Sequence, residues 1–246
     1  MAQPLTDAIH ALTRYANEVT GQSDTTLSDA VETLVEGYGQ GGGGGGVLKW
    51  VAHTTTQIPM FKGEFPEIDE IIVDMNDIAT TVPTCGYISL ATANAKISYI
   101  NVLPNTTHGS DFFRQAGTFS EIDLGGISPT SMTRWFYQMS YSANGVVHQG
   151  DITIRNLNLD RLANVSSSFN NQPSGTQFDV YCTGELMNSI SMNIATWTDA
   201  SLNRLIDCLH DYSGGDAHTL TLGTATVARI SSEKVALATA KNWSLA

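Results

Sequence analysis

Three neighbouring carboxylates, those of Glu67, Asp69 and Glu70, are the first side chains in this sequence whose spacing could do chemistry. Two carboxyl groups placed on either side of a sugar bond are what a glycosidase needs. These residues alternate along one short segment, and this is more typical of the solvated face of a β-strand. We therefore predict that they are not a catalytic acid pair.

A second candidate is a set of oxygen ligands for calcium, formed by Asp74, Asn76 and Asp77. A calcium loop of the EF-hand type also needs a glycine at its sixth position and a glutamate at its twelfth, and both are missing here. The six histidines include no pair at metal-ligand spacing. We predict no metal and no cofactor. The three cysteines are widely spaced and form no CxxC pattern: Cys85, Cys182 and Cys208.

The common catalytic motifs are missing from the sequence as well. It contains no GxSxG, no HExxH and no phosphate-binding GxxxxGK[ST]. The net charge is −12, and the 12 basic residues are scattered, which argues against nucleic acid as a partner. No apolar run approaches the ~18 residues of a membrane span. We predict a protein that is not an enzyme and does not insert into a membrane.

A run of glycines organises the chain that must position any site. Glycine loses more backbone entropy on ordering than any other residue, so this run predicts a flexible linker. We expect a helical arm over residues 1–40, the linker over 41–46, a β-rich head over 47–198 and a capping block over 199–246. The linker residues are Gly41, Gly42, Gly43, Gly44, Gly45 and Gly46.

The arm shows helical spacing of its apolar residues. Two helices are predicted, separated by a polar turn at residues 22–25, and Gly21 ends the first. Helices this short are not stable alone, so their apolar faces must pack on copies of the arm, on a partner or on the head. The glycine run favours attachment or oligomerisation over docking on the head. The predicted contact residues are Leu5, Ile9, Leu12, Val19, Leu27, Val31, Leu34 and Tyr38.

The head contains a recurring apolar pattern. Two stretches fit the leucine-rich template apolar-x-x-apolar-x-apolar-x-x-Asn, and later ones keep its apolar half. Each such unit is one strand with a return loop, and it buries its apolar side only by stacking on a neighbour. The pattern predicts an α+β protein with a short, irregular leucine-rich-repeat-like β-solenoid; the alternative is a β-sandwich. The template residues are Ile68, Ile71, Val73 and Asn76; Ile97, Ile100, Val102 and Asn105; Phe119, Ile122, Leu124 and Ile127; Ile152 and Ile154; Phe178 and Val180; and Leu220 and Leu222.

The template also makes two structural predictions. It places an asparagine after each of the first two strands, where its side chain satisfies backbone groups at the bend. It also predicts one equivalent position in each unit, occupied in turn by Ile71, Ile100, Ile122, Ile152, Phe178 and Leu220.

Aromatic residues lie between the predicted strands, notably Phe112-Phe113 and Trp135-Phe136-Tyr137. Large aromatic side chains usually supply core area, so we predict that they fill the interior on the return segments. Tyr137 and Tyr141, four residues apart, are the predicted exceptions. They are the candidate receptor-binding residues, as platforms on which sugar rings could stack.

The end of the chain predicts a cap. Apolar residues at helical spacing indicate a helix over 199–209, alternation indicates a strand over 218–222, and a last helix is expected over 231–240. A stack of repeats needs its terminal core covered, and this helix–strand–helix block is suited to that role.

Both ends of the chain resemble known proteins. The stretch DYSGGDAHTLTLGTATVARISSEKVALATAKNWSL resembles the ending of BspA-like leucine-rich-repeat proteins of gut bacteria and their phages, except that Asn242 replaces a usual glycine. The stretch LTDAIHALTRYANEVTGQSDTTLSDAVETLVEGYG resembles the N-terminal helical segment of tail- and fibre-type proteins of phages. Together the resemblances imply a phage virion protein with a particle anchor and a repeat head facing the host.

The expected function is therefore that of a non-enzymatic tail-fibre or receptor-binding virion protein. Its expected partners are other virion proteins through the arm, further copies of itself, with a trimer favoured by analogy, and a host-surface glycan or protein. The sequence shows no signal peptide, so we expect synthesis in the host cytoplasm and localisation on the phage particle. The alternatives are a head fibre or capsid decoration protein, a bacterial cell-surface adhesin and a glycan-cleaving depolymerase.

Overall fold

The computed structural model describes residues 46–52, 63–65, 68–78, 88–90, 94–103, 106, 109–139, 141, 145–172 and 174–246. The chain divides into two compact units, and all of these residues belong to the second, Val47–Ala246, except Gly46, which is the last residue of the first. The predicted arm and residues 41–45 of the predicted linker lie outside the described residues. Gly46, predicted as the end of the linker, is instead the first residue of a strand.

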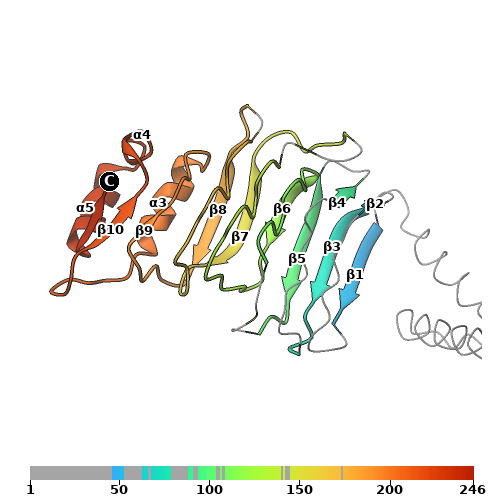
Figure 1. The fold of residues 1–246 in the computed structure, drawn as a ribbon, viewed down its shortest axis with the longest axis horizontal. Helices are drawn as coiled ribbons and strands as arrows, with labels where there is room; N and C mark the ends of the chain where they lie inside the picture. The colour runs from blue at the N-terminus through green and yellow to red at the C-terminus, as the bar shows by residue number, and fades with distance from the viewer. Residues whose placement is uncertain are drawn as a thin grey trace, which may run out of the picture. The chain divides into compact units, whose positions relative to one another are not determined.

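The main element is a six-stranded sheet whose strands follow their order in the sequence. Every strand pairing with a described register is parallel, here and in the smaller sheets, so the antiparallel β-sandwich alternative is wrong for the described part of the chain. The strands lie side by side along the length of the head (Figure 1). They are β1 (Gly46–Val51), β3 (Ile68–Asp74), β5 (Ala95–Ile100), β6 (Phe119–Asp123), β7 (Ile152–Asn158) and β8 (Phe178–Thr183), while β2 (Gly63–Phe65) and β4 (Ile88–Leu90) form a separate pair.

The register of this sheet corrects the predicted repeat. Ile71 pairs with Ile97, and not with Ile100, whose side chain is 38% exposed. In β5 the buried residues alternate as Ala95, Ile97 and Tyr99, so Ile100 points to the opposite, outer face of the strand. In the next two strands the template predicted Ile152 and Phe178, but the residues in this row are those two positions later, Ile154 and Val180. The observed row is Ile71, Ile97, Ile122, Ile154 and Val180, all buried.

Carboxylates at the strand ends fix the bends that follow. Asp74 Oδ1 accepts hydrogen bonds from the Asn76 N–H (3.0 Å) and from Asn101 Nδ2 (2.8 Å). Asp123 Oδ1 accepts from the Gly125 N–H (2.9 Å) and from Asn156 Nδ2 (2.7 Å) in the same way. The same arrangement thus recurs at two strand ends.

The predicted role of asparagine at the bends is confirmed for one residue and shifted for the next. Asn76 Nδ2 donates to the Ala52 carbonyl (3.2 Å), and so satisfies a backbone group. Asn105 lies outside the described residues, and the asparagine observed directly after the second strand is Asn101, whose side chain donates to Asp74 at the first bend. Its φ of 53° is in the left-handed region, which asparagine tolerates better than most residues.

The return segments form a second set of pairings. Three five-residue segments, 111–115, 134–138 and 167–171, each have a left-handed residue at both ends. The Phe113 N–H donates to the Trp135 carbonyl (2.7 Å), and the Phe136 N–H donates to the Ser168 carbonyl (3.0 Å). Backbone bonds therefore join the return segments as well as the strands.

Aromatic rings stack along these return segments inside the head. The Phe113 and Phe136 ring centroids are 5.5 Å apart, and those of Phe136 and Phe169 are 5.2 Å apart. The prediction that the return aromatics fill the interior is confirmed for a set of fully buried residues, which are Phe112, Phe113, Trp135 and Phe136.

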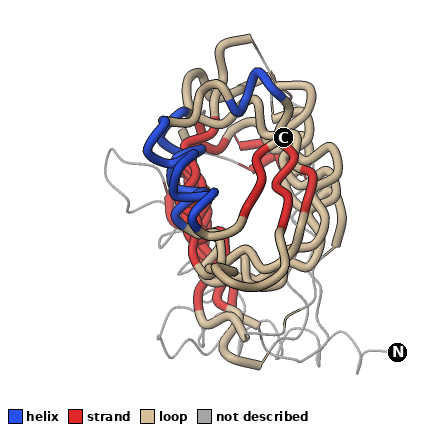
Figure 2. The backbone as a smooth tube through the Cα atoms, turned by 90° about the vertical axis from the view of Figure 1, so that its left-hand side faces the viewer, coloured by secondary structure: helices blue, strands red, loops and turns tan. Residues whose placement is uncertain are grey.

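The C-terminal part contains the predicted helix, strand and helix. The helices α3 and α5 continue the row of strands beyond β8 (Figure 1), and a three-stranded parallel sheet lies across from them (Figure 2). Leu220, predicted as a member of the main sheet, pairs in this smaller sheet with Ile190 and Leu245. The elements are β9 (Ile190–Ser191), α3 (Asp199–Asp207), β10 (His218–Thr221), α4 (Thr224–Val227), α5 (Ser232–Ala240) and β11 (Trp243–Leu245).

Candidate functional site

The two predicted receptor-binding tyrosines occupy different environments. Tyr137 is half-buried, and the Arg114 guanidinium lies 5.3 Å from its ring centroid. Its hydroxyl accepts a hydrogen bond from Asn171 Nδ2 (2.6 Å). Tyr141 is 52% exposed, and its carbonyl accepts from the Gly117 N–H. The structure therefore does not bring the two rings together as one platform, but Tyr137 contacts a residue that lines a cavity.

That cavity is a groove of about 510 Å³ between two segments, 169–177 and 193–196. The first segment leads into β8 and the second follows β9. No lysine, arginine, histidine, aspartate or glutamate is found among its lining residues. They are Phe169, Asn170, Asn171, Gln172, Gly175, Thr176, Gln177, Asn193, Ala195 and Thr196.

Hydrogen bonds hold the two walls of this groove against each other. Asn193 Nδ2 donates to Asn170 Oδ1 (3.1 Å) across it. Gln172 Nε2 donates to the Phe136 carbonyl (2.6 Å) and to the Asn170 carbonyl (3.1 Å), and this ties one wall to the return segments. The groove is thus formed by side chains whose positions are already fixed.

Two oxygens in the walls of the groove have no hydrogen-bond partner. They are Gln172 Oε1 and Thr196 Oγ1, and both atoms are buried. An amide oxygen accepts hydrogen bonds, and a hydroxyl both donates and accepts. Buried polar atoms are nearly always paired, so each of these two calls for a partner. Because both atoms are enclosed by the protein, their missing partners are a cost within the fold and not contacts offered to the groove.

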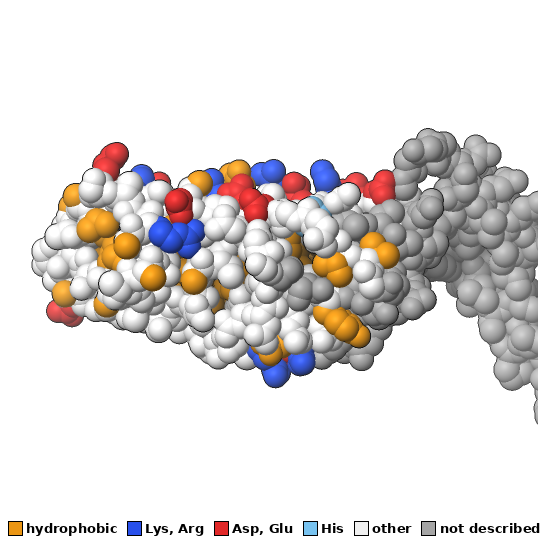
Figure 3. Space-filling model, turned by 90° about the horizontal axis from the view of Figure 1, so that it is seen from above, with side chains coloured by type: hydrophobic (Ala, Val, Ile, Leu, Met, Phe, Trp, Pro, Cys, Tyr) orange, Lys and Arg blue, Asp and Glu red, His pale blue; other side chains and the backbone are white. Residues whose placement is uncertain are grey.

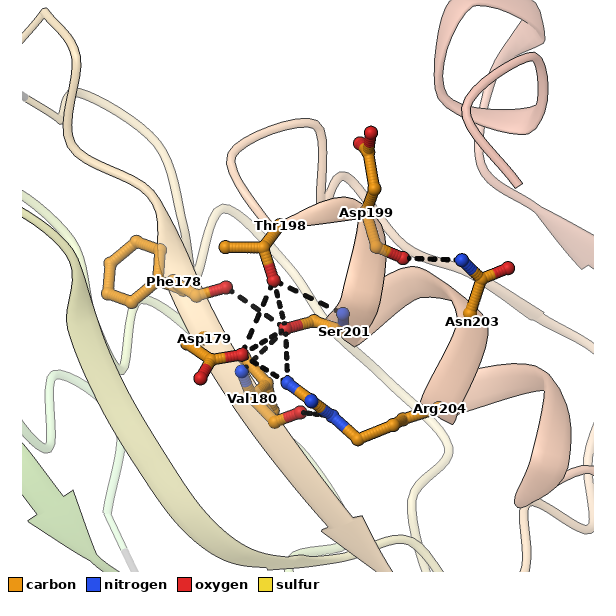
Figure 4. A network of polar contacts seen from close by, with 8 residues as sticks. All are labelled: Phe178, Asp179, Val180, Thr198, Asp199, Ser201, Asn203 and Arg204. Atoms are coloured by element: carbon orange, nitrogen blue, oxygen red, sulfur yellow. Dashed lines mark hydrogen bonds and ion pairs between the residues drawn. The ribbon is translucent and has the colours of Figure 1, made fainter. Parts of the chain in front are cut away.

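The outer face of the main sheet is a different surface, because its charged groups are paired with one another. Arg204 forms an ion pair with Asp179 and also donates to the Val180 carbonyl. Ser201 lies at the centre of this network, where its hydroxyl accepts from the Val180 N–H (2.7 Å) (Figure 4). Tyr181 lies between two guanidinium groups, with Arg155 at 5.0 Å and Arg204 at 4.0 Å from its ring centroid.

The charged groups on this face are balanced in sign. Seen from above, acidic and basic side chains gather along one long edge of the head, and the surface beside them is mainly neutral (Figure 3). Burial raises the pKa of Asp179, but hydrogen bonds from Arg204, Tyr181 and Ser201 outweigh this, so its pKa lies below the ordinary value. The carboxylate is therefore fully charged at neutral pH and engaged with its neighbours.

Two of the three calcium-ligand candidates considered above, Asp74 and Asn76, are already used by the protein. Burial raises the pKa of Asp74, but hydrogen bonds from Asn101, Lys49 and Asn76 outweigh it and lower this pKa overall. Its second oxygen forms an ion pair with Lys49 Nζ at 3.0 Å. Within the described part of the chain, no cluster of three His, Cys, Asp or Glu residues could hold a metal ion.

The described histidines and cysteines lie outside the groove. His148 Nδ1 contacts Asn94 Oδ1 (2.8 Å), His210 forms a pair with Glu185, and His218 stacks on Tyr212. The free thiols are those of Cys182 and Cys208, and burial raises the pKa of both.

Sequence reasoning missed the groove, although the sequence carries a signal for it. Segment 167–171 (Ser-Ser-Phe-Asn-Asn) repeats the return-segment pattern of 134–138 (Arg-Trp-Phe-Tyr-Gln), with Asn170 in place of Tyr137 after the shared phenylalanine. Two further amides follow at Gln172 and Gln177. This enrichment in amide side chains is the sequence signal that marks the groove.

Comparisons with models of known protein families, with curated proteins and with solved structures found no match to this chain. Among the described helices, none has the length and apolar character that would be needed to cross a membrane.

Proposed function

We propose that this chain is a non-enzymatic virion structural protein of the tail-fibre or receptor-binding type. In this proposal residues 1–40 attach it to the particle and associate with other copies, and the head binds the host surface. The observation that carries the adhesive role is the groove at 169–177 and 193–196, which is neutral, lined largely by amide side chains and bridged by a hydrogen bond between its walls.

We also infer that the head is a short leucine-rich-repeat-like solenoid, closed by the block 199–246. Three observations support this inference: the strands pair in parallel in their order along the chain, the return segments pair with one another, and phenylalanine rings stack between the two sets. A solenoid presents an extended surface on which a binding groove is held rigidly.

Oligomerisation through the arm would make weak binding by each head sufficient. When several heads are tethered, each later binding event takes place at a high effective concentration, and avidity can exceed the single-site affinity by roughly 10²–10⁴. A homotrimer is the expected state by analogy with phage fibres.

A pair of assays on the full chain tests the two halves of this proposal. The first compares purified particles made with the native chain and with a chain carrying Leu12→Asp and Leu34→Asp in the arm. We expect only the native chain to sediment with particles, because the charges oppose burial of the apolar faces. Equal incorporation of both chains would contradict the role of the arm.

The second assay incubates the fluorescently labelled full chain with cells of the phage's host and of resistant strains. We expect staining of host cells by the native chain and by the arm variant when each is added at high concentration. A chain that is present in particles but stains no host strain would contradict adhesion and favour a head-fibre or decoration role.

A further inference from the structure

We infer that the outer face of the main sheet is a docking surface for the same face of a second copy of this chain. The inference concerns how heads associate with one another, and it does not depend on the proposed adhesion. Such pairing links heads whether the arms hold two, three or more chains together.

Exposed apolar side chains gather on this sheet. Parallel sheets usually have both faces covered, but several outward side chains of this one are open to solvent. Of the four large apolar side chains that are exposed in the described part of the chain, three lie on its strands: Val47, Ile100 and Tyr181. Apolar side chains that gather on one exposed surface are typical of an interaction site.

The outward charges of the same face change sign from one element to the next. They are negative on β3, positive on β5, negative on β6, positive on β7 and negative on β8, and α3 continues the row with a positive charge (Figure 1). The residues are Glu70, Lys96, Glu121, Arg155, Asp179 and Arg204.

A row of this kind is complementary to itself after a half-turn. We place a two-fold axis parallel to the strands, between β6 and β7, so that the face meets its own copy with the order of elements reversed. Then β3 faces α3, β5 faces β8 and β6 faces β7 of the second copy. Opposite charges meet in each case, and the facing pairs are Glu70 with Arg204, Lys96 with Asp179 and Glu121 with Arg155.

The ion pairs within one copy hold these groups in position and leave them accessible. Arg155 Nε lies 3.3 Å from Glu121 Oε1, and the Arg155 side chain is still 43% exposed. A guanidinium has five N–H donors, so one ion pair does not use all of them. Lys96 is exposed and has no ion-pair partner among the described residues, so its charge is available to another chain. Side chains that are already oriented lose less freedom on binding.

The half-turn also brings exposed apolar groups together. Because β8 faces β5, Tyr181 of one copy lies against the strand that carries Ile100 in the other, and symmetry makes this contact twice. Tyrosine and arginine are the side chains that most often contribute strongly at the centre of protein–protein interfaces. A face about six strands wide and six residues long covers roughly 500 Å² per copy, so about 1,000 Å² is buried in total, which is the lower limit for a specific interface. We therefore expect a weak, reversible dimer.

The test measures the oligomeric state of the full chain by sedimentation velocity over a range of protein concentrations. The chain carries Leu12→Asp and Leu34→Asp, so that association through the arm does not hide association of the heads. We expect a monomer–dimer equilibrium that shifts towards the dimer as the concentration rises.

Two variants, each with a matched control, locate the interface. Lys96→Glu places an acid opposite Asp179 at both symmetry-related sites, and should weaken dimerisation at least roughly tenfold. Arg161→Glu makes the same change of net charge at the turn after β7, and should leave dimerisation unchanged. Ile100→Thr should weaken it roughly three- to tenfold by removing apolar contact area. Its control, Tyr141→Thr, removes an exposed apolar side chain that does not belong to the sheet. Circular dichroism confirms that each variant is folded.

Cross-linking tests the orientation of the two copies. Ser98→Cys on β5 and Thr183→Cys on β8 are made in separate chains, which are then treated with a short bismaleimide. Because β5 faces β8 of the other copy, a mixture of the two chains should give a cross-linked dimer. Each chain alone should give much less, since neither strand faces itself, and the chain without these substitutions is the blank.

Three results would overturn the inference. The first is a chain that stays monomeric at every concentration measured. The second is a dimer whose affinity Lys96→Glu and Ile100→Thr leave unchanged. The third is cross-linking of the single variants that equals cross-linking of the mixture. None of these results bears on host-cell staining or on incorporation into particles, which test the proposed function separately.

Discussion

The amide-lined groove and the outer face of the main sheet are both polar, but they use polarity in opposite ways. On the sheet face the charged groups are each other's partners: Arg204 engages Asp179, Arg155 engages Glu121, and both guanidinium groups flank Tyr181. In the groove the side chains are neutral, and two of their oxygens have no partner. The contrast shows that the sheet face satisfies its polar groups by pairing charges, whereas the groove leaves two neutral oxygens unpaired inside its walls.

The difference has an energetic basis. An exposed ion pair contributes about 0–1 kcal/mol to stability, so losing its partner costs an exposed charge little. A buried polar atom without a partner costs about 1–3 kcal/mol in lost solvation. The two unpartnered oxygens of the groove therefore lower the stability of the fold, whereas the paired charges of the sheet face do not.

The largest expected effect comes from removing the Phe136 ring, which packs both on Phe169 of the groove and on Phe178 of the main sheet. Phe136 stacks between Phe113 and Phe169, and its ring lies 5.9 Å from that of Phe178 at the start of β8. Phe136→Ala should lower the free energy of unfolding by about 3–5 kcal/mol, because it leaves a cavity in the centre of the aromatic stack. Chemical denaturation followed by circular dichroism measures this change.

The same variant also tests whether the groove depends on the stack. The backbone amides of 169–172 should exchange faster with solvent even under conditions where the variant remains folded, because the Phe169 ring stacks on the Phe136 ring. Tyr141→Ala, an exposed aromatic change outside the stack, is the control. If Phe136→Ala lowered the free energy of unfolding by less than about 1 kcal/mol, the aromatic stack would not be the support that the groove and the main sheet share.

The next effect isolates the sheet face. Ser201 is fully buried, and its hydroxyl accepts from the Val180 N–H and donates to the Phe178 carbonyl. Ser201→Ala leaves a buried backbone N–H unpaired and should cost about 1–3 kcal/mol in the free energy of unfolding. Asp207→Asn on the same helix removes only an exposed pair with Lys234 and should cost about 0–1 kcal/mol. Equal losses for the two variants would contradict the importance of the network.

The features that could be predicted from the sequence are those that depend on residues close together in the chain. The strands near Ile71, Ile122 and Ile154 were predictable because buried residues alternate within a short segment. The helices α3 and α5 were predictable, and their boundaries moved by only one or two residues, whereas α4 was not predicted. The strand register was not predictable, because Ile100 fits the template as well as any inward residue and only pairing with β3 shows that it points outward.

The groove depended on information that is not local. Its walls come from segments some twenty residues apart, and they meet only because the return segments stack in register. Its chemistry depends on which amides are already occupied: Asn170 accepts from Asn193, whereas the Gln172 oxygen is free. An amide-rich stretch can be read in the sequence, but its remaining capacity cannot.

Acid should affect the two regions differently. The pKa values of Asp74 and Asp179 are lowered in the folded protein: burial raises both, but their hydrogen bonds and salt bridges outweigh it. Groups with a lowered pKa contribute stability that is present above the unfolded value, about 3.9, and is lost as pH falls through the folded value. The free energy of unfolding should therefore fall below about pH 4, and Asp74→Asn combined with Asp179→Asn should flatten that fall.

The groove provides the internal control for this pH dependence. No titratable side chain lines it, so the NMR shifts of its side-chain amides should stay constant between about pH 5 and 8. Native chain and variants are compared by urea denaturation at each pH, and the amide shifts are followed by NMR across the same range. Amide shifts that change in this range would show that a titrating group acts on the groove.

The smallest effect is the sharpest form of the comparison, because it makes one substitution at two threonines that are two residues apart. Thr196 belongs to the groove and its hydroxyl has no partner, while Thr198 is the N-cap of α3 and accepts from the Ser201 N–H (3.2 Å). Thr198→Val should cost about 0.5–2 kcal/mol by removing the cap. Thr196→Val should leave the free energy of unfolding unchanged or raise it by up to about 0.5 kcal/mol, since no bond is lost and an unpaired hydroxyl is removed. Thermal and urea denaturation of both variants measure the difference. If Thr196→Val destabilised the head as much as Thr198→Val, its hydroxyl would be a structural group, and the distinction between a satisfied sheet face and an unsatisfied groove would fail at the residue where it is clearest.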